Sequence, residues 1–88
     1  MLTKSFAITC PVGMHARPAS VLVSIATGFK SQISIKYQDK NVPANSLIGV
    51  MTLGAETGEK VEVTVSGEDE EAAMKRMEDF FEKELQDL

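Results

Sequence analysis

Apolar and polar residues alternate in three stretches of the chain, and each stretch predicts a β-strand with one buried face. The three stretches are residues 2–9, 33–37 and 61–65. A shorter strand is expected at residues 40–42, because Pro43 suits the end or the edge of a sheet. The pattern therefore predicts four short strands.

Apolar residues at helical spacing predict three helices between and after these strands. The first should begin near His15 or Ala16, since Pro18 fits only in a first turn, and it should stop at Gly28. A short helix should run from a cap at Asn45 or Ser46 to about Leu53. The last follows Gly67, and its apolar stripe is Ala73, Met74, Met77, Phe80, Phe81, Leu85 and Leu88.

The element order β-α-β-β-α-β-α predicts an α+β fold for residues 1–88 as a single domain. The economical packing is an open-faced sandwich in which helices cover one face of a four-stranded sheet. With 88 residues the core is thin, so we expect function to lie at the surface rather than in a deep cavity.

Charge is uneven along the chain, whose formal net charge is −4. Residues 67–88 hold nine acidic and three basic residues, whereas residues 1–66 hold four acidic and six basic ones. The acidic balance, with no basic stripe and no Trp, argues against nucleic acid as a direct partner. A small α+β nucleic-acid module is therefore a weak alternative.

No apolar run is long enough for a membrane span, and the first residues resemble neither a signal nor a transit peptide. We therefore expect a cytoplasmic protein without a membrane partner. The single cysteine, Cys10, excludes an internal disulfide and a CxxC zinc site, and we expect it to be buried. No cofactor and no metal are expected.

The sole histidine, His15, stands where the first strand's break meets the first helix. Unpaired N–H groups and partial positive charge at a helix start favour anions such as phosphate. Arg17 can add charge-assisted hydrogen bonds to phosphoryl oxygens. The same field should keep the imidazole neutral and nucleophilic, which favours a phosphoryl acceptor. By spacing alone, an ordinary surface histidine remains an equal alternative.

Two segments carry a resemblance to a known family. Gly13-Met14-His15-Ala16-Arg17-Pro18-Ala19 resembles the active-site signature of HPr, the histidine-containing phosphocarrier of the bacterial sugar phosphotransferase system. The segment from Asn45 to Gly54 resembles the regulatory-serine region of its Gram-positive branch. The resemblance covers essentially the whole chain, and it implies an open-faced β-sandwich of four antiparallel strands under three helices.

This resemblance implies a relay of phosphoryl groups. His15 would be phosphorylated on its ring Nδ1 by enzyme I, which draws on phosphoenolpyruvate, and would pass the group to IIA domains of sugar transporters. Ala16 and Arg17 would form the phosphate cradle, and Arg17 would assist both transfers. The protein would be a carrier rather than an enzyme.

Ser46 would be the site of regulation in carbon catabolite repression. Alone, Ser46 is most simply a helix cap. The resemblance implies that an ATP-dependent HPr kinase/phosphorylase phosphorylates it, and that the modified form binds the catabolite control regulator. A second hypothesis is a regulatory-only paralogue that acts through Ser46 as a transcription co-regulator, although this chain keeps His15.

An apolar docking patch is expected from Ala16, Ser20, Leu47, Ile48 and Met51. Helical spacing also allows parts of this set to be core, so we expect a split. Leu47 and Met51 should be at least partly exposed, whereas Val50 and Leu53 should be buried.

Four positions depart from the family pattern, of which Pro11 and Pro43 are only less usual. Val12 stands where a small polar residue is usual near the phosphate, and Asn45 replaces a common lysine.

Overall fold

The computed structural model of the chain describes residues 1–11, 13–14 and 16–88. The predictions that fall on Val12 and His15 lie outside the described residues.

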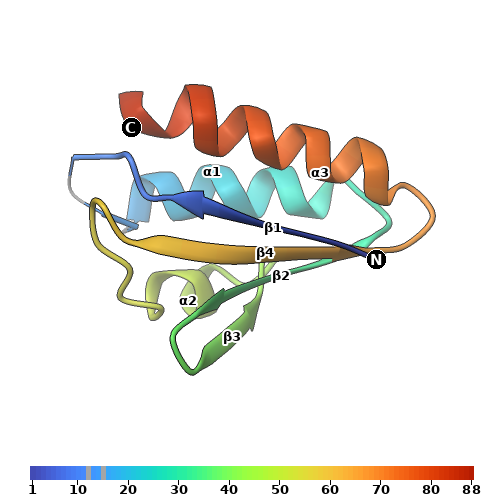
Figure 1. The fold of residues 1–88 in the computed structure, drawn as a ribbon, viewed down its shortest axis with the longest axis horizontal. Coiled ribbons are helices and arrows are strands. Elements are labelled where there is room, and N and C mark those ends of the chain that lie inside the picture. Colours follow the sequence, from blue (N-terminus) through green and yellow to red (C-terminus); the bar gives the residue numbers. More distant parts are fainter. Residues whose placement is uncertain (12, 15) are drawn as a thin grey trace.

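The described residues form a four-stranded, fully antiparallel sheet with the strand order β1-β4-β2-β3 (Figure 1). The strands are β1 (Leu2–Ala7), β2 (Gln32–Tyr37), β3 (Lys40–Pro43) and β4 (Lys60–Ser66). β4 lies between β1 and β2, so the first strand of the chain becomes an edge of the sheet next to the last strand. Pro43 ends the other edge strand, as the sequence predicts.

Three α-helices complete the described fold. They are α1 (Ala16–Thr27), α2 (Leu47–Met51) and α3 (Glu70–Asp79), and α3 continues into a π-helical turn, η1 (Phe80–Glu84), and a 3-10 turn, η2 (Leu85–Asp87). The predicted α+β open-faced sandwich and its element order are confirmed. Figure 1 shows α1 and α3 running along the direction of β4.

One helix prediction needs correction. α2 ends at Met51, before the predicted Leu53, because the chain turns there so that the Leu53 side chain is buried and Gly54 takes a positive φ of 75°. The last helix does not keep α-helical pitch to its end. Its wider turn leaves both Phe80 and Phe81 within the core at no more than 1% exposure.

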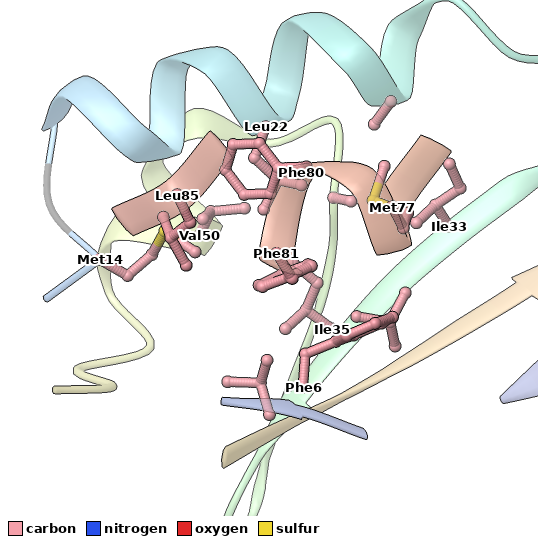
Figure 2. Close-up of a cluster of buried hydrophobic side chains, with 14 of the residues drawn as sticks. Phe6, Met14, Leu22, Ile33, Ile35, Val50, Met77, Phe80, Phe81 and Leu85 are labelled. Carbon is pink, nitrogen blue, oxygen red and sulfur yellow. The ribbon is translucent and has the colours of Figure 1, made fainter. Parts of the chain in front are cut away.

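The core lies between the inward face of the sheet and the apolar stripes of α1 and α3. The strand alternation is confirmed, since Val61, Val63 and Val65 are all buried. The ring of Phe81 stacks on Phe6 of β1 with centroids 4.8 Å apart, and Phe80 meets Phe81 edge-on at 5.1 Å. Figure 2 shows these rings within the cluster of buried side chains.

A carboxylate organises the turn between α1 and β2. The Oδ1 and Oδ2 atoms of Asp69 accept hydrogen bonds from the backbone N–H groups of Ser31 and Lys30, both at 2.8 Å, and Oδ1 also accepts one from the Ser31 hydroxyl. Gly67 approaches the same turn so closely that a Cβ there would lie 2.6 Å from the Cα of Ser31. This corner therefore has no room for a side chain at position 67.

We predict that Gly67→Ala lowers the free energy of unfolding by about 1–3 kcal/mol, the usual cost of overpacking. Gly28→Ala is the control, because a Cβ there would make an ordinary 3.4 Å contact with the Ile25 carbonyl. Urea denaturation of both variants measures the difference. Equal effects of the two substitutions would contradict a steric role for Gly67.

Acid should destabilise the fold partly through Asp69. Hydrogen bonds from the Ser31 hydroxyl, above all, and from the backbone hold the pKa of Asp69 below its ordinary 3.8. A lowered folded-state pKa contributes stability above the unfolded pKa, and this contribution is lost as pH falls through the folded value. Asp69→Asn should therefore be less stable at neutral pH but lose less stability on acidification. Denaturation midpoints from about pH 6 down to about pH 2.5 test this, and parallel pH curves would refute it.

Candidate functional site

The candidate site lies at the start of α1, where an arginine meets the positive end of a helix. Ala16 and Arg17 are exposed, whereas Pro18 and Ala19 are buried. Pro18 has no N–H to leave unpaired, and its fixed φ favours the first turn. The Arg17 guanidinium and the free amides of this turn can thus both face an anion in solvent. His15, the predicted phosphoryl acceptor, lies outside the described residues.

The chain before α1 is anchored to the loop that precedes β4. The Met14 N–H donates to the Ala55 carbonyl at 3.2 Å, and the Met14 side chain is buried. Gly13 has a φ of 78°, and a Cβ there would lie 3.1 Å from the same Ala55 oxygen. Glycine is therefore required at position 13 both by its backbone conformation and by the close approach of residues 55–56.

Two hydrogen bonds join Cys10 and Gly13. The Gly13 N–H donates to the Cys10 carbonyl at 3.3 Å, and the Cys10 thiol donates back to the Gly13 carbonyl at 2.8 Å. Cys10 is fully buried, as predicted. The hydroxyl of Thr57 also donates to the Cys10 carbonyl, at 2.6 Å. Sequence reasoning missed Thr57, because a Thr-Gly pair in a turn gives no sign of which distant carbonyl the hydroxyl will meet.

Ser46 caps α2, which decides between the two predicted caps. Its backbone is extended, with φ −106° and ψ 109°, and its Oγ accepts the Gly49 N–H at 3.1 Å. A Cβ at position 49 would lie 3.0 Å from that Oγ and 3.3 Å from the Cβ of Val42. The small residue at 49 thus leaves room for the capping oxygen.

The apolar side chains of α2 and of Leu53, just after it, divide into exposed and buried ones as predicted. Ile48 is 75% exposed, Leu47 42% and Met51 40%, whereas Val50 and Leu53 are buried. α2 packs against α1, on which Ala16 and Ser20 are also exposed. Figure 1 shows α2 toward the end of the molecule where α1 begins. Exposed Leu, Ile and Met together are typical of a docking surface.

Residues 1–11, 13–14 and 16–88 contain no cluster of His, Cys, Asp or Glu side chains that could hold a metal ion. Among the helices that the structure describes, none is long and apolar enough to cross a membrane.

Comparison with known proteins gives consistent matches. The family model described as "PTS HPr component phosphorylation site" matches residues 2–83. The phosphocarrier protein HPr of Lysinibacillus sphaericus is 40% identical over 77 residues, which cover 88% of each chain.

Solved structures agree. HPr-C-His from Thermoanaerobacter tengcongensis superposes with a TM-score of 0.91 at 38% identity, over 97% of this chain and 96% of that one. Crh of Bacillus subtilis, a catabolite-repression protein described as a dimer with a swapped domain, gives a TM-score of 0.76 at 31% identity over 96% and 97% of the two chains.

The family model spans nearly the whole chain, and the fold and the curated relative agree with it. The chain therefore belongs to the HPr family of phosphocarrier proteins of the phosphotransferase system.

Proposed function

We propose that this protein accepts a phosphoryl group on His15 from enzyme I and passes it to IIA domains of sugar transporters. The observation that carries the proposal is the exposed Arg17 in the proline-containing first turn of α1, in a chain of the HPr family. In the first transfer, a bond forms between phosphorus and ring Nδ1 of His15 while the bond from phosphorus to the donor breaks. In the second transfer, the bond between phosphorus and Nδ1 breaks while a bond forms from phosphorus to the next acceptor.

Arg17 and Ala16 would form the phosphate cradle of this relay. The guanidinium of Arg17 is exposed, so it can reach phosphoryl oxygens that a partner protein presents. The free amides of the first turn add positive potential, because their N–H groups point out of the helix start. No acidic residue among Ala16–Ala19 offsets this potential. Such charge stabilises the group during transfer and also in the phosphorylated product.

A carrier must release what it accepts, so its site should not bind phosphate too completely. An exposed cradle at a helix end fits this need, because the partner protein can supply the remaining contacts. We therefore regard the protein as a carrier in the cytoplasm rather than an enzyme. Its exposed Leu47, Ile48 and Met51, with Ala16 and Ser20, would be the surface on which partners dock.

Ser46 would regulate the relay through phosphorylation by an HPr kinase/phosphorylase. Its Oγ lies at the start of α2, where a negative charge is electrostatically tolerated. The added charge would stand beside Leu47 and Ile48 and would change which partners dock, with a catabolite control regulator as the expected partner of the modified form.

A regulatory-only role is the second candidate, and the similarity to Crh favours it. In that case phosphate on Ser46 would matter and His15 would not be phosphorylated. The two roles differ in chemistry, because phosphohistidine is acid-labile and phosphoserine is acid-stable.

We predict that His15→Ala abolishes phosphoryl acceptance from phosphoenolpyruvate and enzyme I. The wild-type protein should gain one acid-labile phosphate, seen by mass spectrometry at neutral pH and lost after acid treatment. Thermal unfolding should show that the variant remains folded. Acceptance at full rate by the variant would overturn the assignment of His15. A wild-type protein that gains no acid-labile phosphate here, but gains acid-stable phosphate on Ser46 from ATP and an HPr kinase/phosphorylase, would favour the regulatory role instead.

We also predict that Ser46→Asp lowers the rate of acceptance at His15 by about tenfold, because it adds negative charge to the face that docks on enzyme I. Ser66→Asp is the matched control, since it makes the same change at the exposed last residue of β4, which pairs with Gln32 of β2. Initial rates under identical salt compare the two. If both variants react at the wild-type rate, Ser46 does not share the docking face.

A further inference from the structure

Both ends of the segment before α1 are anchored to one loop. At the front end the Thr57 hydroxyl donates to the Cys10 carbonyl at 2.6 Å, and at the far end the Met14 N–H donates to the Ala55 carbonyl at 3.2 Å. Between these two anchors, the Gly13 N–H donates to the Cys10 carbonyl and the Cys10 thiol donates to the Gly13 carbonyl. The loop that holds residues 55 and 57 thus fixes where the chain enters α1.

The loop of residues 55–59 is itself held in place by Ile8 and Tyr37. The backbones of Ile8 and residues 58–59 exchange two hydrogen bonds, Ile8 N–H to the Glu59 carbonyl and Gly58 N–H to the Ile8 carbonyl, both at 2.8 Å. The Glu59 carboxylate accepts the Tyr37 hydroxyl at 2.5 Å and the Glu56 N–H at 3.0 Å. The Tyr37 hydroxyl, first among these donors, lowers the pKa of Glu59, so the carboxylate stays charged at neutral pH.

This bracing connects the loop to the tip of the β2–β3 hairpin, which carries Tyr37. Thr57 therefore offers its hydroxyl from a loop whose position is fixed on two sides. Its bond to Cys10 has little to do with core packing, because the Thr57 side chain is exposed. What the bond fixes is the position of the Cys10 carbonyl, to which the Gly13 N–H also donates. Only two residues separate Gly13 from Ala16 of the candidate cradle.

We infer that Thr57 is a positioning residue for phosphoryl transfer: its hydroxyl, through the Cys10 carbonyl, holds Gly13 and Met14 in the orientation that aims the start of α1 at the incoming phosphoryl group. This inference rests on the proposed phosphocarrier function. A group that acts through orientation lowers the rate of the chemical step when it is removed, and it leaves partner binding nearly unchanged.

Thr57→Val tests the inference, because valine keeps the branched shape and removes the hydroxyl. With the protein as the varied substrate of enzyme I, we expect kcat to fall about threefold to tenfold, the range of one neutral hydrogen bond, with KM within about twofold. Thr57→Ser restores the hydroxyl and should return kcat to within about twofold of the wild type.

Thr27→Val is the matched control. It removes a threonine hydroxyl that also donates to a backbone carbonyl, that of Ser24 at 2.9 Å, but at the far end of α1. Its kcat and KM should equal those of the wild type. A fall in kcat as large as that of Thr57→Val would show a general effect on α1 and would overturn the inference.

Hydrogen exchange of the unphosphorylated protein gives a readout that does not depend on enzyme I. The Gly13 amide should exchange faster in Thr57→Val than in the wild type, whereas the Thr27→Val variant should leave it unchanged. If the wild type accepts no phosphoryl group, the proposed function fails while the exchange result still reports on the hydrogen bond between Gly13 and Cys10. Unchanged kcat in Thr57→Val, a rise in KM alone, no rescue by serine, or unchanged exchange would each overturn the positioning role.

Discussion

The pairing of β1 with β4 is the constraint on which the candidate site depends. Phe6 lies opposite Val61 and Ala7 opposite Lys60, so the chain leaving β1 and the chain entering β4 run together past the end of the sheet. Because side chains alternate between faces, a shift of one residue in this register would turn Phe6 and its neighbours out of the core. Burial of the Phe6–Phe81 stack therefore fixes, at a distance, which backbone groups of residues 8–14 and 55–59 can meet.

The elements could be predicted from the sequence because their signals are local. The valines of β4 alternate, Pro18 marks the start of α1, and Ser46 marks the start of α2. The strand order was beyond such reasoning, since alternation says which face is buried and not which strand is the neighbour. The end of α2 was misjudged for a related reason: the burial of Leu53 in the turn is a tertiary effect that helical spacing does not register.

The candidate site also has features that the sequence could predict and features that it could not. The placement of Arg17 at an exposed helix start follows from the motif and from simple helix chemistry. The split of α2 into an exposed and a buried side follows from its periodicity. The sequence could not indicate the roles of Thr57, Glu59 and Tyr37. Thr57 bonds to Cys10, and Tyr37 bonds to Glu59, so both hydrogen bonds join residues that are far apart in the sequence. Long-range polar contacts of this kind leave no periodic trace.

The Oγ atom of Ser46 both caps α2 and is the atom that phosphorylation would modify. The oxygen of Ser46 that receives the Gly49 N–H is the atom that esterification would occupy. A side chain at position 49 would narrow the space around that oxygen, because a Cβ there would lie 3.0 Å from it. With glycine there, a group on the oxygen has the Gly49 amide as its neighbour. The resonance of this one amide is thus a natural spectroscopic reporter, in which the occupancy of the serine could be followed without labelling the phosphate.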